Sequence, residues 1–552
     1  MGKFFKVNRF TLATFGLFGF IFWHLAKEML QVRPDGWYVG QINLYGDLVL
    51  HLSFINKILE TNKILVGSPI FAGPKPNYPI AADFITAQVA KITGVDFALF
   101  IITFLMGLIV IYSSRVFIRI FIRNDRVVFL SLLLFFLNGG FGFYYFFQDL
   151  ITNQNSLFNF FLAMPHQYTD IKDKSYWWIN SYLAYFLPQR GFLFAFPITL
   201  IVLSLLYVGF KRKKIYFFIL AGLLSGVMPL VQAHSLFVIF LVSAPLALIT
   251  ILKSQKKEET FIFWSIFALI TAVIALPSFL SISSSGAILK SIRFEPGWTS
   301  KENIILFWIK NLGLFAPILV VSLGWLYKKN RYLFSLYLPF LGIFLISNIL
   351  VFQPWEFDNS KLLIYWFFTS AIIVAYFLDD QFFRENIIKK ILGILIIFIM
   401  ILSGSLDIFR TFTPVTSYQI FTSHDLEIAT AVKNLTPKDA VFVTASNHNN
   451  PIPALSGRAT LLGFHGWVWS HGLDYQNREE DIKTIYLGGK TAEDLIAKYK
   501  VNYVTISPQE KSMFSVNVSY FETYPKITLG NDWQIYDVSN LFQESENHGD
   551  RP

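Results

Sequence analysis

Residues 191–214 read GFLFAFPITLIVLSLLYVGFKRKK, an uncharged apolar run followed by four consecutive cations. About 20 apolar residues in a helix span the hydrocarbon core of a bilayer. Basic residues directly after such a helix are typical of the cytoplasmic side of a membrane. We therefore expect a membrane-spanning helix over 191–210 whose last residue lies at the cytoplasmic face.

The same pattern recurs over the first three quarters of the chain. The 552-residue sequence is 54% hydrophobic and 15% charged, whereas soluble proteins contain about 25% charged residues. Apolar runs lie near 10–29, 96–114, 127–147, 191–210, 215–232, 235–252, 260–282, 304–327, 332–352, 362–379 and 391–409. These lengths predict a polytopic α-helical membrane protein with about eleven transmembrane helices.

Charge alternates between the connections of these runs. Every second connection is short and basic, with the cations Arg115, Arg119, Arg123 and Arg126, Lys211 to Lys214, Lys253, Lys256 and Lys257, Lys328, Lys329 and Arg331, and Arg384, Lys389 and Lys390. The positive-inside rule places these connections and the N-terminus in the cytoplasm and, with an odd number of spans, the C-terminus outside. We expect a multi-pass protein of the plasma membrane.

Composition excludes several classes of function. The formal net charge of +10 comes largely from the basic connections, so it does not indicate a nucleic-acid partner. The chain has no cysteine, which rules out disulfides and thiolate metal sites. It has no complete Walker-type G-x-x-x-x-G-K-Ser/Thr phosphate loop and no G-x-G-x-x-G after a strand. This argues against an ATP-driven pump and against an enzyme that uses sugar nucleotides.

The sequence divides into a transmembrane domain, 1–411, and a soluble domain, 412–552. In the first, the connections predicted to face outward are 30–92, 148–190, 283–303 and 353–361, and long ordered loops tend to be functional. In the second, residues 441–444 and 501–506 are typical of strands, and 425–434 and 491–499 of helices. This alternation predicts a small extracytoplasmic α/β domain.

Asp47 is the first candidate functional residue. It lies early in the first outer loop, four residues before His51, so that the two side chains share a face of a helix. Leu48, Leu52 and Ile55 would form an apolar face that rests on the membrane surface. The carboxylate at the start of such a helix is either functional or a partner of the helix dipole.

Residues 353–361, QPWEFDNSK, place several polar groups between two spans. Glu356, Asp358 and Lys361, within a nine-residue loop at the membrane face, are suited to bind an anionic lipid headgroup. The alternative is a solvated turn in which Asp358 pairs with Lys361, with Trp355 as an interfacial anchor.

Two further candidates lie beside apolar runs. Arg190 directly precedes a span, where a guanidinium either grips a phosphate or extends to the interface. His234 belongs to Gln232-Ala-His-Ser235 between two apolar runs. Polar groups at membrane depth face a cavity or a partner helix, and both readings stay open for this segment.

The soluble tail contains a region rich in aromatic and amide side chains. Residues 447–450 (NHNN), Arg458 in Ser-Gly-Arg, and His471 within 463–475 (GFHGWVWSHGLDY) belong to it. Aromatic faces stack on sugar rings, and Asn, His and Asp bind hydroxyl groups. The region either binds a sugar or forms a structural loop over the membrane domain.

The whole layout resembles the GT-C superfamily of membrane glycosyltransferases, which includes protein O-mannosyltransferases, the aminoarabinose transferase of lipid A and oligosaccharyltransferases. The shared plan has many spans, an essential acidic residue near the start of a long first outer loop, and an outer C-terminal domain. Asp47 occupies the place of that residue. The segments around Asp47 and His51, at Leu187–Arg190, at Pro354–Lys361 and at Gly457–Arg458 carry the resemblance.

The resemblance implies that a sugar, such as mannose or another hexose, moves with inversion from a polyprenyl-phosphate donor to a glycan, lipid or protein acceptor outside the membrane. Asp47 would be the general base. Arg190, Lys361 and His234 would offset the charge of the phosphate that leaves. Substrate-binding residues would be His51, Trp355, Glu356, Asp358, Asn359, Arg458 and His471.

Three points stay open at this level. A divalent ion, Mg²⁺ or Mn²⁺, would find oxygen ligands in Asp47, Glu356 and Asp358. A transporter or flippase of a lipid-linked glycan would also have many spans and buried polar groups. A non-catalytic scaffold of glycan assembly is the third alternative.

Overall fold

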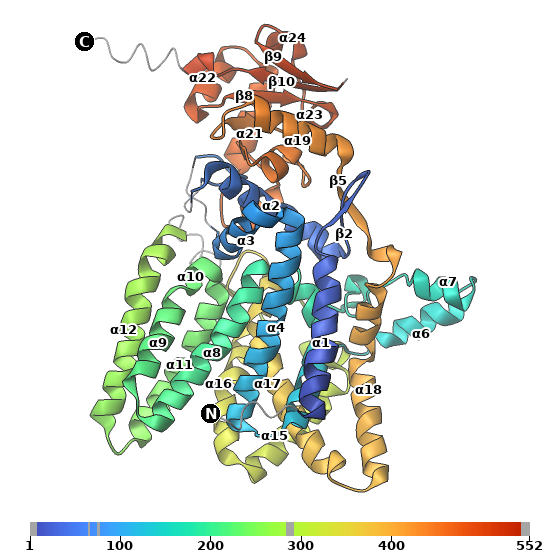
Figure 1. Cartoon of the computed structure of the whole chain (residues 1–552), viewed down its shortest axis with the longest axis vertical. Coiled ribbons are helices and arrows are strands. Elements are labelled where there is room, and N and C mark those ends of the chain that lie inside the picture. Colours follow the sequence, from blue (N-terminus) through green and yellow to red (C-terminus); the bar gives the residue numbers. More distant parts are fainter. Residues whose placement is uncertain (1–7, 64–66, 74–77, 283–291, 531, 543–552) are drawn as a thin grey trace.

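The structure is a computed structural model that describes residues 8–63, 67–73, 78–282, 292–530 and 532–542. A bundle of long helices carries a small sheet domain at one end (Figure 1). Among the described residues, seven helices are long and apolar enough to cross a membrane. They are α1 (Arg9–Lys27), α4 (Val95–Phe121), α8 (Arg190–Arg212), α11 (Ala233–Lys253), α12 (Lys257–Ile282), α17 (Ser360–Leu378) and α18 (Ile387–Arg410). The predicted helical membrane domain is confirmed.

The helix lengths give a smaller number of spans than the predicted eleven. A bent pair, α14 (Ile304–Leu312) and α15 (Phe315–Lys329), meets at 95° and would make an eighth span. Helices α9 (Ile215–Gly226) with α10 (Met228–Val231), and α16 (Arg331–Ser347), are apolar but shorter.

The apolar run 127–147 is not one helix. Helix α5 (Asp125–Phe136) ends well before α6 (Phe143–Thr152) begins. Gly140 lies in the break, where a Cβ atom would stand 2.0 Å from the carbonyl oxygen of Lys310. The chain passes so close to α14 at this point that a side chain is sterically excluded, and apolar composition alone does not reveal the break.

Helix α6 and the next helix, α7 (Leu157–Leu162), project from the side of the bundle (Figure 1). Their exposed side chains include Ile151 and Phe158. The rest of the predicted outer loop 148–190 returns to the bundle through the turns Lys172–Lys174 and Tyr182–Phe186.

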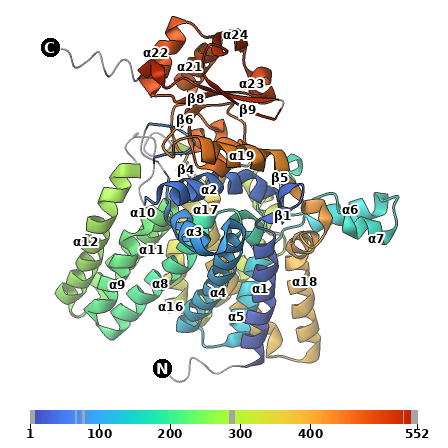
Figure 2. The same ribbon diagram turned by 45° about the horizontal axis from the view of Figure 1, so that its top comes forward.

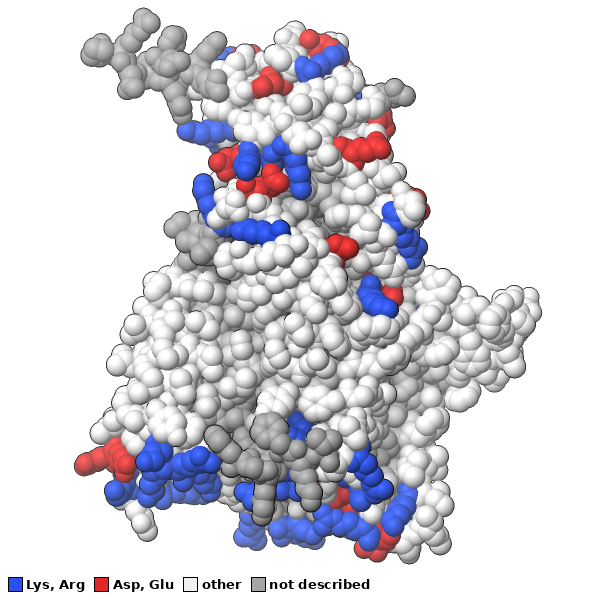
Figure 3. All heavy atoms as spheres, viewed as in Figure 1, with Lys and Arg blue, Asp and Glu red and all other residues white. Residues whose placement is uncertain are grey.

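Lysine and arginine gather at the end of the bundle opposite the sheet domain (Figure 3). We call this the basic end, and the other the domain end. Ion pairs hold the basic end together, for example Arg384–Asp379 at 2.9 Å and Lys329–Asp380 at 2.9 Å.

Helices α2 (Ile42–Thr61) and α3 (Ala81–Thr93) lie at the domain end, between the long helices and the sheet domain (Figures 1 and 2). The side chain of Gln41 caps α2 by accepting a hydrogen bond from the backbone N–H of Leu44 at 2.8 Å. The helix predicted around Asp47 is therefore confirmed. Its apolar face is buried, with Leu52 and Ile55 fully inaccessible to solvent.

The sheet domain has five strands in the order β7-β6-β8-β10-β9. Their bounds are β6 (Val441–Val443), β7 (Ala459–Thr460), β8 (Tyr503–Ile506), β9 (Lys526–Leu529) and β10 (Trp533–Asp537). Strand β6 pairs in parallel with β7 and β8, whereas β10 runs antiparallel to β8 and β9. Helices α19 (Ser423–Leu435), α21 (Gln476–Leu487) and α22 (Lys490–Tyr499) pack around it. The predicted α/β character is confirmed.

Two connections fix the sheet domain to the bundle. Strand β5 (Tyr418–Thr422) pairs with β2 (Gly36–Val39), which pairs with β1 (Gln31–Arg33). Gly457 packs on the backbone of α2 with φ +68°, and a Cβ atom there would stand 2.7 Å from the carbonyl carbon of Asn56. The sheet domain is therefore held directly on α2, the helix that carries Asp47.

Candidate active site at the domain end

Asp47 lies in the second turn of α2. Its Oδ2 accepts a hydrogen bond from Nε2 of Gln189 at 2.9 Å, and the side chain is partly exposed. Burial raises the pKa of Asp47 to about 6, and the nearby His51 and Lys361 act in the opposite direction. A carboxyl group with such a pKa is ionised at neutral pH yet basic enough to take up a proton.

Lys361 and Asp358 form an ion pair that influences this carboxyl group. The short turn Glu356–Asn359 leads into α17, and Nζ of Lys361 lies 2.9 Å from Oδ1 of Asp358. Lys361 lowers the pKa of Asp47, whereas Asp358 raises it. The predicted candidates Asp47, Asp358 and Lys361, far apart in the sequence, are thus brought within electrostatic reach of each other.

Two histidines lie around the same ion pair. His234, at the start of α11, is hydrogen-bonded to the side chain of Gln353 and is influenced by the charges of Lys361 and Asp358. His471, from the soluble tail, stands under the influence of the same two charges, and burial lowers its pKa to about 4. The bundle and the tail therefore both contribute to the surroundings of Lys361.

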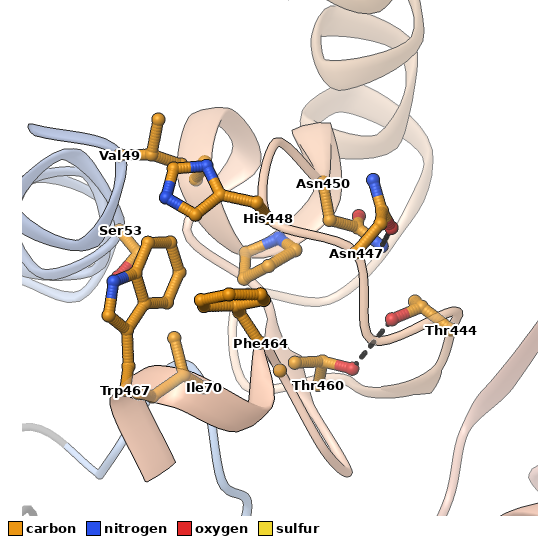
Figure 4. Close-up of a pocket in the computed structure, with 13 residues that line it drawn as sticks. Val49, Ser53, Ile70, Thr444, Asn447, His448, Asn450, Thr460, Phe464 and Trp467 are labelled. Carbon is orange, nitrogen blue, oxygen red and sulfur yellow. Dashed lines mark hydrogen bonds between the residues drawn. The ribbon is translucent and has the colours of Figure 1, made fainter. Parts of the chain in front are cut away.

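The aromatic segment of the tail covers the beginning of α2. Both Nε2 of His448 and Nε1 of Trp467 lie near the carbonyl oxygen of Gly46, at 3.0 and 3.2 Å. The ring of His448 also stacks on Tyr45 with centroids 5.1 Å apart. Figure 4 shows the small cavity between the two parts, where His448 and Trp467 lie opposite Ser53 of α2. This segment closes over the residue next to Asp47.

Arg190 and His51 meet at a residue that the sequence did not single out. The guanidinium of Arg190 is fully buried, donates from Nη2 to Oγ1 of Thr86 at 2.6 Å, and has its Nε 3.8 Å from Asp83. Nδ1 of His51 lies 2.9 Å from Oδ1 of Asp83. Arg190 thus faces the interior of the protein, and its neighbour Gln189 contacts Asp47.

No family model matches the sequence, and no curated protein is similar to it in sequence. Two solved structures of ArnT from Cupriavidus metallidurans are similar in fold. The apo form has a TM-score of 0.52 at 11% identity, and the form bound to undecaprenyl phosphate a TM-score of 0.50 at 10% identity. Both cover 96% of this chain and 98% of the other.

A third similar structure is the oligosaccharyltransferase of Archaeoglobus fulgidus with a tethered acceptor peptide. It has a TM-score of 0.50 at 11% identity and covers 92% of this chain and 70% of the other. The chain shares the fold of these structures, the GT-C fold.

Within the GT-C fold of this chain, other predicted site residues stand apart from Asp47. Asn359 is fully buried and stabilises its own turn by donating to the carbonyl oxygens of Ser347 and Leu350 at 2.9 and 2.6 Å. Glu356 lies 3.6 Å from Arg293, and the indole of Trp355 is exposed. The structure shows no contact between these three side chains and Asp47.

Arg458 lies at the contact between the soluble tail and α2. Its buried guanidinium donates to Glu60 on α2 at 2.9 Å and to the carbonyl oxygens of Lys433 and Thr436, each at 2.9 Å. This geometry ties the soluble tail to α2, some distance along the helix from Asp47. The contacts fit a structural role better than the substrate-binding role expected from the sequence.

Two of the three carboxylates that could ligate a metal ion are each paired with a cation. Among the described parts of the chain, no three His, Cys, Asp or Glu side chains gather as they would around a metal ion. Glu356 pairs with Arg293, and Asp358 pairs with Lys361. The three carboxylates considered as ligands from the sequence, including Asp47, are thus not gathered into one site.

Asp83 is the functional candidate that sequence reasoning missed. It occurs as a single acid in the apolar stretch IAADFIT, 80–86. A fully buried aspartate is rare unless it is paired. The sequence signal would have been this isolated charge in a segment that is otherwise suited to burial.

Proposed function

We propose that the protein is a glycosyltransferase that moves a sugar from a polyprenyl-phosphate donor to an acceptor at the domain end of the bundle. The observation that carries this proposal is the environment of Asp47, a partly exposed carboxyl group with a pKa of about 6 beside Lys361. A base and a cation at the edge of a membrane bundle are the groups that transfer from a lipid phosphate requires.

The chemistry is a single displacement. A carboxylate oxygen of Asp47 takes the proton of the acceptor hydroxyl as the hydroxyl oxygen attacks the anomeric carbon of the sugar. The bond between that carbon and the phosphate oxygen breaks, and the electron pair leaves with the phosphate. Attack opposite the leaving group inverts the configuration. The lipid phosphate provides the driving force, so that no nucleotide is needed.

The leaving phosphate is assigned to Lys361 and His234. Both lie near the aqueous end of a long helix and are partly exposed, so that a headgroup can reach them. Lys361 is paired with Asp358, and we propose that it exchanges this carboxylate for the phosphate when the donor binds. Arg190 is too deeply buried for direct contact, and in this proposal it acts only through Asp83.

The proposed orientation follows from the charge distribution. Lysine and arginine gather at the basic end (Figure 3), and such clusters are retained in the cytoplasm. The domain end, with Asp47 and the soluble domain, then faces outward, and the donor enters from the outer leaflet. The likeness in fold to ArnT bound to undecaprenyl phosphate supports a donor of this kind.

The test is the loss of transfer on substitution of Asp47. Membrane vesicles from cells that express the protein supply native acceptors, and a polyprenyl-phosphate donor with a labelled hexose is added. We expect Asp47→Asn to lower the rate at which the labelled hexose is released from polyprenyl phosphate by at least about 100-fold. The matched control is Asp96→Asn, the same change at an exposed position on α4.

Undiminished transfer by folded Asp47→Asn would remove this residue from the reaction. Vesicles that move the labelled donor across the bilayer without breaking its glycosidic bond would identify a flippase instead. A protein that does neither, yet restores glycan assembly in a deletion strain, would be a scaffold.

A further inference from the structure

A buried group of three side chains lies behind the proposed base. The carboxylate of Asp83 on α3 is completely buried, and its Oδ1 and Oδ2 lie 2.9 and 3.1 Å from Nδ1 of His51 on α2. On its other side, Nε of Arg190 on α8 lies 3.8 Å from Oδ1. Three helices, α2, α3 and α8, therefore supply one connected polar cluster.

The chemistry of this cluster fixes the protonation pattern of His51. An ionised carboxylate only accepts hydrogen bonds, and the guanidinium of Arg190 balances the charge of Asp83. Nδ1 of His51 must therefore carry a hydrogen and donate it to Asp83. In the neutral imidazole this leaves the lone pair on Nε2.

Nε2 is available on the side of the ring away from Asp83. No hydrogen bond from Nε2 to another residue occurs among the described parts of the chain. Asp47 lies one helical turn before His51, and residues four apart on a helix are neighbours on one face.

We propose that Asp83 is a positioning residue that holds His51 in the Nδ1–H tautomer, so that Nε2 removes from Asp47 the proton taken from the acceptor. In this step the O–H bond of the Asp47 carboxyl group breaks and an Nε2–H bond forms. The imidazolium that results is stabilised by Asp83 and then gives its Nε2 proton to water, so that Asp47 is again a carboxylate and His51 again neutral before the next turnover. This inference rests on the proposed function.

The other polar groups around His51 do not replace Asp83 in this role. The hydroxyl group of Tyr78 lies 3.3 Å from Nδ1, a longer contact than either carboxylate oxygen. Lys361 and His471 are cationic or neutral, and Asp358 is paired with Lys361. Asp83 is the carboxylate in direct contact with the ring.

Substitution of Asp83 by asparagine should reverse the tautomer. Arg190 attracts the amide oxygen of the new side chain, which turns its NH₂ group toward Nδ1 of His51. A donor in that position requires the lone pair on Nδ1 and moves the hydrogen to Nε2. The same carboxylate-to-amide change beside a catalytic imidazole traps the wrong tautomer in serine proteases.

The experiment reads the tautomer directly. Full-length protein with ¹⁵N-labelled histidine is studied in detergent by NMR, and the His51 signals are assigned by their loss in His51→Gln. We expect Nδ1–H in the wild type and in Tyr78→Phe, and Nε2–H in Asp83→Asn. Wild-type protein with Nε2–H, or Asp83→Asn that keeps Nδ1–H, would overturn the proposal.

The kinetics of sugar transfer test whether this tautomer of His51 matters for turnover. Asp83→Asn and His51→Gln should each lower kcat by at least about tenfold with the KM for the donor unchanged, and the double variant should be no slower than either. Asp83→Glu, which keeps the carboxylate, should restore most of kcat and the Nδ1–H tautomer. His51→Gln leaves the Asp83–Arg190 pair in place and keeps the test informative if Asp83→Asn does not fold.

The proposed function and the positioning role of Asp83 would be refuted by different results. A wild type that transfers no sugar refutes the proposed function, whatever the tautomer of His51. An active wild type whose variants at His51 and Asp83 lose kcat only in proportion to the loss of folded protein refutes the positioning role alone. Asp96→Asn, exposed on α4, controls for loss of an acidic residue in general.

Discussion

Substitution of Asp47 by asparagine should stabilise the folded protein while it abolishes transfer. Burial raises the pKa of this carboxyl group from 3.8 to about 6, so that its ionised form is disfavoured in the folded state. At neutral pH this costs up to about 3 kcal/mol of unfolding free energy, since each pKa unit corresponds to about 1.4 kcal/mol. A neutral amide avoids the cost and can still accept the hydrogen bond from Gln189.

The size of this stabilising effect depends on pH. A group whose folded pKa lies above its unfolded pKa stabilises the protein only while it is protonated, so the stability is lost as pH rises from about 4 to about 6. Asp47→Asn should therefore match the wild type near pH 4 and exceed it at pH 7. Thermal unfolding in detergent at one scan rate, repeated across this pH range, measures the difference.

Asp83→Asn gives the opposite expectation and serves as the contrast. The change leaves the buried guanidinium of Arg190 without its carboxylate partner, and removal of one member of a buried ion pair costs about 3–5 kcal/mol. If Asp47→Asn also lowered the unfolding midpoint at pH 7, Asp47 would be a structural residue. The argument that burial disfavours its ionised form would then be refuted.

Three further predictions concern the rate and the assembly. The transfer rate should fall about fivefold between pH 6 and pH 5, because Asp47 has a pKa of about 6 and must be ionised to act as the base; a rate that does not change over this range would contradict this. Lys361→Met should raise the KM for the donor. It should also shift the acid limb of the pH–rate profile to higher pH, because Lys361 lowers the pKa of Asp47; an unshifted limb in kinetics across a pH series would contradict this. Arg458→Met should destabilise the protein by about 3–5 kcal/mol and expose the soluble tail to limited proteolysis, because Glu60 loses its buried partner; an unchanged digestion pattern would count against this anchor.

Local sequence patterns predict those parts of this fold that depend on local physics. Apolar runs of membrane length give the long helices, because a bilayer imposes the same requirement on each one. The helix around Asp47 is predictable because its apolar residues recur at helical spacing. The break at Gly140 is not predictable in this way, since its cause is the close approach of a distant carbonyl group.

The candidate site, like the fold, is predictable from the sequence only where local patterns determine it. Asp47 and Lys361 are recognisable as polar groups at the ends of apolar segments. Their convergence with His471 depends on the docking of the soluble tail on α2, a contact between segments that lie 402 and 421 positions apart at Gly46. Asp83 escapes notice because a single acid carries no periodic signal, and its meaning comes only from its contact with His51 and Arg190.

In the proposed mechanism, charge balance explains why Asp47, rather than the other two carboxylates in this region, acts as the base. Asp83 is balanced by Arg190 and Asp358 by Lys361, with closest distances of 3.8 and 2.9 Å. Asp47, by contrast, accepts its hydrogen bond from the neutral side chain of Gln189. The carboxylate without a direct cationic partner keeps a raised pKa and remains free to take a proton.

This balance should change when the donor binds, and the change is measurable. If Lys361 turns from Asp358 to the phosphate, the carboxylate of Asp358 is left without its cation, and the pKa of Asp47 rises further because its ionisation becomes less favourable. The acid limb of kcat, which reports the enzyme–substrate complex, should then lie at higher pH than the limb of kcat/KM, which reports the free enzyme near pH 6. In Asp358→Asn both limbs should lie at lower pH than in the wild type, because the carboxylate of Asp358 raises the pKa of Asp47. Coincident limbs in the wild type would show that Lys361 keeps its carboxylate partner throughout, and the phosphate would then have to be held by other groups.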